Sequence, residues 1–241
     1  ERPFEIDAES QLLSSIMAKK HSVAATHIAI DVPVGAHTKV KNKFEALRLK
    51  KEFEKIGRRL KKHVKVLITD GSQPVGNGIG PALEARDVLW VLKRDTRRPI
   101  DLERKCLMIC ANLFSMVGLK DCYKRAAEIL NSGKAYQKMV EIIKAQGGKE
   151  IAAEDIKIGK YSCDVLAKKR GRVSEINNTF VSRIARIAGA PTDKGAGIYL
   201  YKHVGDTVKR GETLFTIYAE SEHEFEYAKD VARNSKVFVV R

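Results

Sequence analysis

The chain has 241 residues and a hydrophobic fraction of 44%, enough for one large domain or two ordinary domains with real cores. No stretch approaches the roughly 18 uninterrupted apolar residues of a membrane helix, and the sequence does not start with a basic and then apolar leader. We therefore expect no membrane partner and a cytoplasmic location. The formal net charge of +15 indicates an anionic partner such as a nucleotide, phosphate or a nucleic acid, without choosing among them.

The cysteines and the charge runs exclude several kinds of site. The four cysteines contain no CxxC pair, so neither a zinc knuckle nor a disulfide framework is indicated. Cys106 and Cys110 lie four residues apart and could share a metal, but we expect them to be buried core thiols and expect no metal site. Residues 50–65 and 94–104 alternate basic with acidic side chains, which is typical of a solvated face rather than of a nucleic-acid stripe.

The first predicted helix carries the polar side chains that are best suited to bind a substrate and transfer a proton to it. It is capped by Asp7, and it ends near Lys19. Its apolar face is formed by residues at helical spacing, namely Leu12, Leu13, Ile16 and Met17. Asp7, Gln11, Ser15 and Lys19 follow one another in steps of four and form one polar stripe. Such a stripe could hydrogen-bond a heterocyclic base, and a carboxylic acid beside it could protonate that base as it leaves; an ordinary solvated helix face is the alternative.

The following elements predict an α/β fold. Residues 26–32 form a strand-like run closed by Pro33 and Gly35, and residues 64–69 form a second strand. A charged helix over about 42–62 separates them, with a buried stripe of Phe44, Leu47, Leu49, Phe53, Ile56 and Leu60. After a glycine-rich loop, Pro81 opens a helix that runs to about residue 93. This order predicts a right-handed crossover and a parallel sheet covered by helices.

In the second half of the chain, the pattern changes from helical to strand-like. Residues 102–145 predict two or three helices, divided at Gly118 and near residues 132–133, and the Gly147-Gly148 pair is the best linker. Beyond it, short apolar runs with glycine punctuation predict a β-rich domain, with strands at 163–167, 172–176, 197–201 and 213–218. We therefore divide the chain into a first helix (1–22), a central α/β region (23–148) and a C-terminal β-rich region (149–241).

Four ordered motifs resemble one enzyme superfamily. They are SIMAKK (15–20), IDVPVG (30–35), ITDGSQPVG (68–76) and AGAPTDKGAGI (188–198), the last followed by GDTV (205–208) and GETL (211–214). In order and spacing they resemble the thymidine and pyrimidine nucleoside phosphorylase superfamily. Within it, residues 1–3, 7–13 and 31–40 look most like the archaeal AMP phosphorylases.

The resemblance implies a fold, a reaction and a set of site residues. It implies that the first helix belongs to an α-domain that is mostly missing here, that the central region is catalytic, and that the C-terminal region is a barrel-sandwich or hammerhead-like domain. The implied reaction is phosphorolysis of AMP to adenine and ribose 1,5-bisphosphate, with inorganic phosphate as co-substrate and no cofactor, in a homo-oligomer. By resemblance, Asp7 is the proton donor to the base, Ser15 contacts the nucleotide's base, and Lys39 is a further nucleotide-contacting lysine. Lys19 matches a base-contacting lysine of the nucleoside-specific relatives. An apolar side chain stands at the place of Lys39 in the nucleoside-specific relatives, so a cation there suits a substrate with a 5′-phosphate.

One part of the family's pattern is not found in this sequence. The phosphate-binding glycine-rich loop with Lys, His and Ser would lie upstream of Glu1, so we expect the chain to begin inside the catalytic domain and to turn over poorly by itself. The glycine-rich run at 76–80 matches a different segment of the family. A lone run of this kind is a weak phosphate signal, so we interpret it as structural.

Two other functions stay open at this point. One is a nucleoside phosphorylase that acts on thymidine, uridine or cytidine. The other is a basic module that binds nucleic acid or assists assembly without catalysis. The aromatic content of 7% and the lack of basic clusters interleaved with aromatic residues count against the second, and we expect no nucleic-acid partner.

Overall fold

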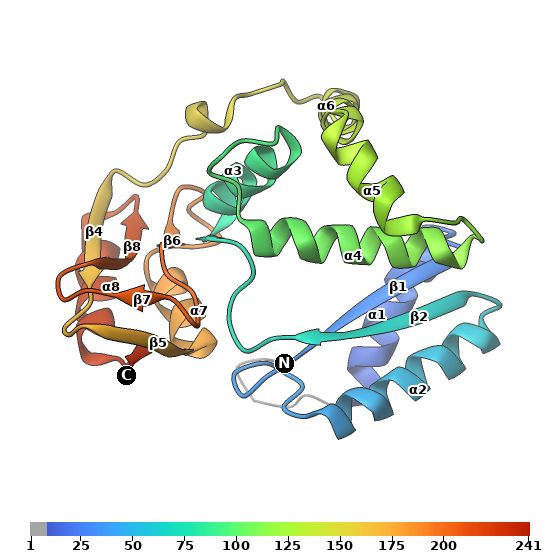
Figure 1. The fold of residues 1–241 in the computed structure, drawn as a ribbon, viewed down its shortest axis with the longest axis horizontal. Helices are drawn as coiled ribbons and strands as arrows, with labels where there is room; N and C mark the ends of the chain where they lie inside the picture. Colours follow the sequence, from blue (N-terminus) through green and yellow to red (C-terminus); the bar gives the residue numbers. More distant parts are fainter. Residues whose placement is uncertain (1–8) are drawn as a thin grey trace. The chain divides into compact units, whose positions relative to one another are not determined.

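A computed structural model describes residues 9–241 (Figure 1). The chain forms two compact units, which are described separately. Unit 1 contains the described residues up to Gly71 together with Leu107–Ala126, and unit 2 contains Ser72–Cys106 and Ala127–Arg241. No helix in residues 9–241 is long and apolar enough to cross a membrane.

Unit 1 is built around two parallel strands. Its first four elements are α1 (Glu9–Ser22), β1 (His27–Val34), α2 (Lys43–Arg59) and β2 (His63–Asp70). β1 and β2 pair in parallel from His27↔His63 to Val34↔Asp70, and α2 connects them and packs against both (Figure 1). The strand was expected to close at Pro33, but it continues to Val34 because β1 is an edge strand, where the missing proline N–H removes no ladder bond.

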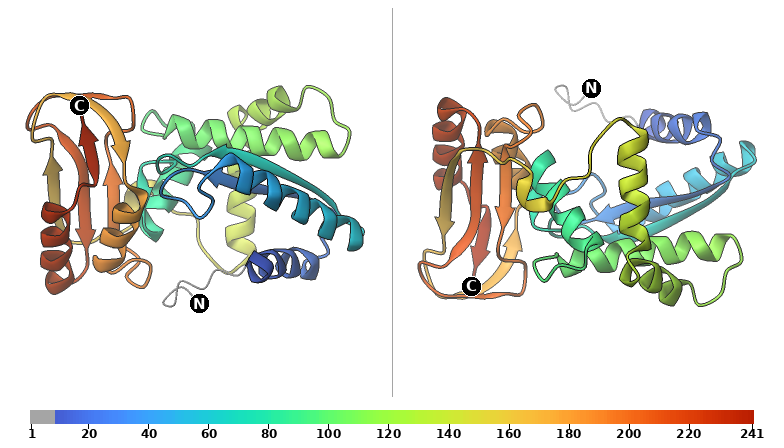
Figure 2. Two further views of the ribbon diagram at one scale, coloured as in Figure 1. Left: turned by 90° about the horizontal axis from the view of Figure 1, so that it is seen from below. Right: turned by 90° about the horizontal axis from the view of Figure 1, so that it is seen from above.

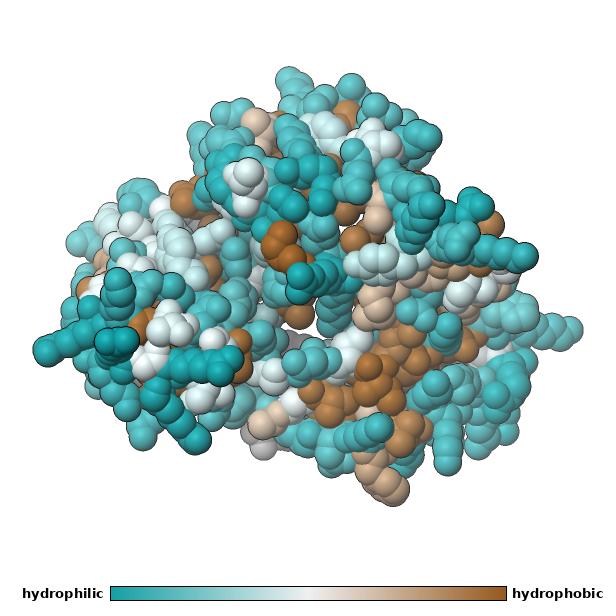
Figure 3. Space-filling view, in the orientation of Figure 1, coloured by the Kyte–Doolittle hydropathy of each residue, from teal (hydrophilic) through white to brown (hydrophobic). Residues whose placement is uncertain are grey.

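Helix α2 shows how the local sequence sets a helix and where the predicted stripe was wrong. The Asn42 side chain accepts a hydrogen bond from the Glu45 N–H (3.0 Å), which caps the helix. Leu49 and Phe53 are buried as predicted, whereas Phe44 is 77% exposed and Leu47 is 42% exposed. Both lie on a side of the helix turned away from the buried ridge, and Figure 3 shows apolar surface in this region.

Three further helices follow α3, as the glycine positions indicated. The helices are α3 (Pro81–Leu92), α4 (Ile100–Met116), α5 (Cys122–Asn131) and α6 (Lys134–Ala145). Gly118 and Gly133 separate them in left-handed backbone conformations with φ of 77°. The predicted burial of Cys106 and Cys110 is wrong, because both are exposed on a helix whose buried residue is Leu107.

Unit 2 contains two antiparallel sheets. The strands are β3 (Gly78–Ile79), β4 (Tyr161–Leu166), β5 (Gly171–Ile176), β6 (Gly197–Leu200), β7 (Thr207–Val208), β8 (Thr213–Ala219) and β9 (Phe238–Val240). Their order is β3-β6-β8-β4 in one sheet and β7-β5-β9 in the other. Figure 2 shows strands of the C-terminal part lying side by side. Side chains from both sheets share one core that includes Val173, Ile198 and Phe215. The observed class is therefore mixed α/β with small antiparallel sheets, while the barrel-sandwich description stays a prediction.

Two helices of this part were not predicted. They are α7 (Asn178–Ile187) and α8 (Glu222–Asn234), and a short 3₁₀ turn, η2 (Ala153–Asp155), precedes β4. The Asn177 side chain caps α7 by accepting from the N–H groups of Thr179 (3.0 Å) and Phe180 (3.2 Å). Strand β3 pairs with β6, so residues 78–79 join the same sheet as residues 197–200. The predicted boundaries at 22/23 and 148/149 stay predictions.

Candidate active site

The carboxyl ends of β1 and β2 form the candidate active-site edge of unit 1. Because the strands are parallel, Val34 and Asp70 end at the same edge, and the loops that follow both strands begin there. Open α/β sheets bind ligands outside the carboxyl ends of their strands. Thr69 donates a hydrogen bond to the Asp31 carboxylate (2.6 Å), which links the two strands close to this edge.

The loop after β1 is closed by its own hydrogen bonds. The Gly35 N–H donates to the carbonyl of Val40 (3.2 Å), and the Thr38 N–H donates to the carbonyl of Gly35 (3.1 Å). The Thr38 hydroxyl oxygen lies 2.9 Å and 2.6 Å from the carbonyl oxygens of Gly35 and Val40. Val40 is buried in the core of unit 1, and its neighbour Lys39 is exposed. The loop therefore presents the Lys39 ammonium from a hydrogen-bonded frame.

Gly71 holds the end of β2 against this loop. Its N–H donates to the carbonyl of Val34 (2.8 Å). A Cβ atom on Gly71 would lie 2.6 Å from the Thr38 methyl carbon and 3.0 Å from the Pro33 Cβ, so a larger side chain would displace the loop. This close approach explains why glycine stands here in the ITDGSQPVG motif.

Helix α1 carries two of the predicted site residues. Leu13 and Met17 are buried in the same core cluster as Val40. Ser15 and Lys19 lie four residues apart on one exposed face, as the predicted polar stripe requires. The structure thus places Ser15, Lys19 and Lys39 in unit 1 on two separate elements.

Asp7, the predicted proton donor, lies outside the described residues. The roles of Asp7, Ser15, Lys19 and Lys39 stay predictions. In residues 9–241 no group of three or more His, Cys, Asp or Glu side chains is placed to hold a metal ion.

The glycine-rich loop of unit 2 has its backbone donors occupied by carboxylates. Asp87 Oδ2 accepts from the N–H groups of Asn77 and Gly78, both at 2.7 Å. Asp101 accepts from the Gly76 N–H (2.9 Å) in the same way. A phosphate would have to displace these carboxylates and would be repelled by them. The arrangement supports the structural interpretation of residues 76–80.

Asp87 is the organising residue that the sequence interpretation missed. It is 1% exposed, and burial raises its pKa above the ordinary value although the Gly78 and Asn77 N–H groups act in the opposite direction. Leu83 precedes it by four residues on the buried face of α3. An aspartate on an otherwise apolar helix face was the signal that could have identified it.

The same loop is bound to the second half of the chain within unit 2. The Asn77 side chain donates to the Tyr199 hydroxyl (3.2 Å), and its oxygen lies 2.8 Å from His203 Nε2. The Val204 N–H donates to the Gln73 side-chain oxygen (2.7 Å). These contacts join polar side chains of the QPVGN run to β6 and to the segment between β6 and β7.

Comparisons with known proteins agree with the motifs. Residues 172–238 match the pyrimidine nucleoside phosphorylase C-terminal domain. This match supports the similarity of the chain to the pyrimidine nucleoside phosphorylase superfamily. The matched range contains α7, the glycine-rich segment before β6 and most of the core that the two sheets of unit 2 share.

The similar proteins carry two different names. Over 242 residues the chain is 45% identical to a protein of Archaeoglobus fulgidus named AMP phosphorylase 1, covering 100% of this chain and 48% of that protein. It is 44% identical over 243 residues to a Bradyrhizobium diazoefficiens protein named "putative thymidine phosphorylase", covering 100% of this chain and 47% of that protein. A Methylococcus capsulatus protein with the same name is 42% identical over 236 residues, or 97% of this chain and 45% of that protein. The chain spans about half the length of the curated relatives it matches.

Proposed function

We propose that this chain is part of an enzyme that cleaves the glycosidic bond of AMP, or of a related nucleoside 5′-monophosphate, with inorganic phosphate. The products are the free base and ribose 1,5-bisphosphate. The observation that carries the proposal is the similarity over the whole chain to the protein named AMP phosphorylase 1. The reaction takes phosphate as co-substrate and needs no cofactor.

Within this proposal each site residue has one role. Asp7 protonates the departing base, which replaces a poor anionic leaving group by a neutral one. Ser15 and Lys19 hydrogen-bond the base from one face of α1, where both are exposed. Lys39 pairs with the 5′-phosphate, and its exposed position on the hydrogen-bonded loop beyond β1 supports this role.

Positioning and charge stabilisation supply the rest of the chemistry. The attacking phosphate must lie beneath the anomeric carbon while the C–N bond breaks and positive charge develops on the sugar. A substrate with a 5′-phosphate gains an additional fixed point at Lys39, so its sugar can be oriented by residues that do not react. This is the physical reason to favour a nucleotide over a nucleoside.

The second candidate is a thymidine phosphorylase, favoured by the name "putative thymidine phosphorylase" that several relatives carry. The two candidates share phosphate-dependent release of base and differ in the need for a 5′-phosphate. The deciding experiment measures free base from AMP, CMP, adenosine, uridine and thymidine at one phosphate concentration, with the whole protein that carries this chain. We expect AMP or CMP to be turned over fastest. Equal or faster turnover of any unphosphorylated nucleoside would contradict the AMP assignment.

A substitution at Lys39 tests the origin of the preference. A charge-assisted hydrogen bond contributes about 1.5–3 kcal/mol, so Lys39→Ala should raise the KM for AMP by about tenfold or more and leave nucleoside kinetics unchanged. Lys51→Ala, which removes an exposed lysine of α2, is the matched control. An equal effect of Lys39→Ala on AMP and adenosine would show that Lys39 does not bind the 5′-phosphate.

The remaining parts of the proposal concern assembly, location and nucleic acid. We propose a cytoplasmic homo-oligomer, which light scattering and cell fractionation can test. The +15 charge would support a nucleic-acid module only if RNA or DNA bound specifically, with affinity falling steeply as salt rises. Such binding without phosphorolysis by the whole protein would replace the enzyme proposal.

A further inference from the structure

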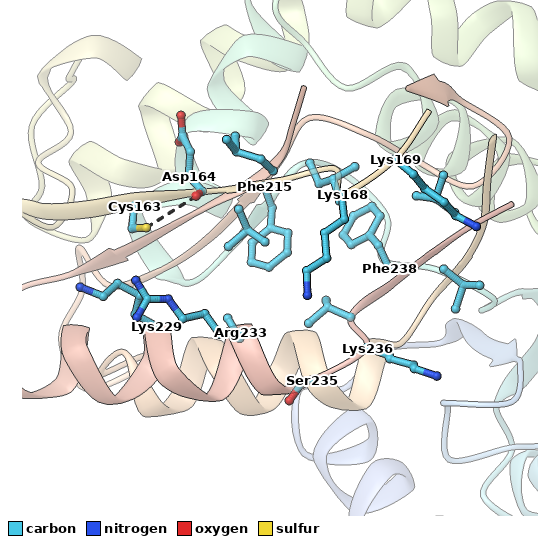
Figure 4. Close-up of a pocket in the computed structure, with 17 residues that line it drawn as sticks. Cys163, Asp164, Lys168, Lys169, Phe215, Lys229, Arg233, Ser235, Lys236 and Phe238 are labelled. Atoms are coloured by element: carbon cyan, nitrogen blue, oxygen red, sulfur yellow. Dashed lines mark hydrogen bonds between the residues drawn. The ribbon is translucent and has the colours of Figure 1, made fainter. Parts of the chain in front are cut away.

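Unit 2 contains a groove that the proposed reaction does not use. It lies where both sheets have open edge strands, β4 in the four-stranded sheet and β9 in the three-stranded sheet, and the C-terminal part of α8 forms another wall (Figure 4). Its volume is about 810 Å³. Ligand sites of roughly 300–1,000 Å³ are typical for small organic molecules. The groove is therefore large enough for one.

The floor of the groove is apolar and continuous with the core. The rings of Phe215 and Phe238 stack with centroids 5.7 Å apart and an interplanar angle of 15°. Phe215 is 1% exposed, while Phe238 and the neighbouring valines of β9 are half-buried. Leu166 at the end of β4 is 47% exposed and extends the apolar wall. A flat apolar body placed here would remove surface from water on both sheets.

The lining of the groove is strongly cationic. Its charged residues are Lys168, Lys169, Lys229, Arg233 and Lys236, with Asp164 the acidic one. Asp164 already accepts a hydrogen bond from the Thr216 hydroxyl (2.5 Å), so its carboxylate is engaged within the sheet. The lining therefore presents excess positive charge beside an apolar floor.

Three of these cations have no ion-pair partner within residues 9–241. Lys229 pairs with Glu226 at 2.6 Å and Arg233 lies 3.6 Å from Asp230, both along α8. Lys168, Lys169 and Lys236 have no such carboxylate in the described part of the chain. In Figure 4 the Lys168 side chain extends toward α8, and Lys169 and Lys236 lie at one end of the groove.

We propose that this groove binds an amphipathic organic anion. A flat aromatic or aliphatic body would lie against Phe215 and Phe238, and a carboxylate, sulfonate or phosphate group would pair with Lys168, Lys169 and Lys236. The chemical requirement is thus a single molecule that combines an apolar body with an anionic head. No residue of the candidate active site takes part, so this proposal stands or falls independently of the phosphorylase assignment.

Three small probes separate the two halves of the requirement. Anilinonaphthalene sulfonate has both body and head, N-phenylnaphthylamine has the body alone, and inorganic phosphate has the head alone. We expect saturable binding of the sulfonate, followed by its fluorescence, with affinity about tenfold weaker for the neutral amine and no displacement by phosphate at an equal concentration. Raising salt should weaken the sulfonate and leave the amine unaffected.

Paired charge variants locate the site. Lys168→Gln with Lys236→Gln should raise the dissociation constant of the sulfonate by about tenfold. The matched control, Lys157→Gln with Arg210→Gln, removes the same charge from exposed residues outside the groove and should change it by less than about twofold. Far-ultraviolet circular dichroism and the emission of Trp90, the single tryptophan, verify that each variant is folded.

Several results would overturn the proposal. Absence of saturable sulfonate binding would do so, as would equal weakening by the groove pair and by the control pair. A peptide alternating glutamate with valine, six residues long like β4, provides the remaining comparison. If it bound more tightly than the sulfonate, the groove would be an edge-strand docking site for acidic segments and the small-anion assignment would be wrong.

Discussion

Replacing Asp87 by alanine should destabilise unit 2 by removing an acceptor from the glycine-rich loop. Asp87 Oδ2 accepts from the N–H groups of Asn77 and Gly78, both at 2.7 Å, and the residue is 1% exposed. The variant therefore leaves the N–H groups of Asn77, which is half-buried, and Gly78, which is buried, without their acceptor. The structural role assigned to residues 76–80 depends on these two bonds.

The expected loss follows from opposing effects. Each unsatisfied buried donor costs about 1–3 kcal/mol, or about 2–6 kcal/mol for two. The substitution also removes a carboxylate whose pKa is raised mainly by burial, which returns part of that cost. We expect Asp87→Ala to lower the free energy of unfolding by about 2–4 kcal/mol and Asp87→Asn, which keeps one acceptor oxygen, to lower it less.

The raised pKa also fixes the direction of a pH effect. The folded state binds the Asp87 proton more tightly than the unfolded state, whose pKa is near 3.8. The stability contributed by Asp87 therefore falls as pH rises from 3.8 through the raised value. The difference in unfolding free energy between wild type and Asp87→Ala should be larger below this window than at neutral pH.

Urea unfolding followed by Trp90 fluorescence measures these effects, because the single tryptophan lies in the same helix as Asp87. Asp230→Ala is the control, since Asp230 is exposed and lies 3.6 Å from Arg233, and it should cost about 0.5 kcal/mol or less. A loss for Asp87→Ala no larger than that of the control would refute the reasoning. An equal loss for the alanine and asparagine variants would show that the acceptor oxygen is not what matters.

Two further predictions concern unit 2. Gly78→Ala places a Cβ 2.4 Å from the carbonyl carbon of Leu83, a backbone atom that cannot rotate away, so thermal denaturation should show a loss of about 1–3 kcal/mol or more; an unchanged Tm would contradict the packing at this turn. Trp90 Nε1 lies 3.5 Å from the Glu154 carboxylate oxygen. The pKa of Glu154 is lowered below 4.5, first by its own backbone N–H and then by Arg97. The contact should therefore hold at neutral pH and be lost as pH falls through the lowered pKa. Trp90 emission should change in that acidic range in wild type and stay constant in Glu154→Gln, and identical titrations of the two proteins would exclude Glu154 as the cause.

Periodicity in the sequence determined the elements that depend on local pattern. The helix over 42–62 was confirmed as Lys43–Arg59, and the strands at 172–176 and 213–218 as Gly171–Ile176 and Thr213–Ala219. The helix combines an asparagine cap with a regular apolar spacing, and the strands are short apolar runs beside Gly171 and Gly211, so local sequence indicates each of them. The three helices after α3 were separable for the same reason, since Gly118 and Gly133 adopt backbone conformations that other residues avoid.

Helices α7 and α8 were missed for a different reason. Val181, Ile184 and Ala185 form an apolar ridge at helical spacing behind an asparagine cap, so the signal was present in the sequence. Because short strands surround this helix, the whole segment was interpreted as β-rich and the helix was not identified. Testing each short stretch of residues separately for helical spacing and for strand alternation would have identified the helix.

For the candidate site, too, some features were indicated by the sequence and others were decided by the tertiary structure. The motifs alone indicated Asp7, Ser15, Lys19 and Lys39, because a resemblance preserves the order of chemically important residues. Which loop is closed and which donors are occupied was decided by tertiary structure. The carboxylate of Asp87 reaches the N–H groups of residues ten and nine positions earlier only after α3 folds back on its own entry loop.

The sequence by itself indicated the resemblance to the superfamily, most of the local elements and the chemistry that the predicted site residues can offer. Only the tertiary structure decided that Phe44 is exposed, that the glycine-rich loop is occupied by Asp87, and that Lys168 and Lys236 line one apolar groove. The physical reason is that local periodicity records which residues avoid water within one element. Burial of a polar group, or convergence of charges from separate strands and helices, depends on how those elements pack.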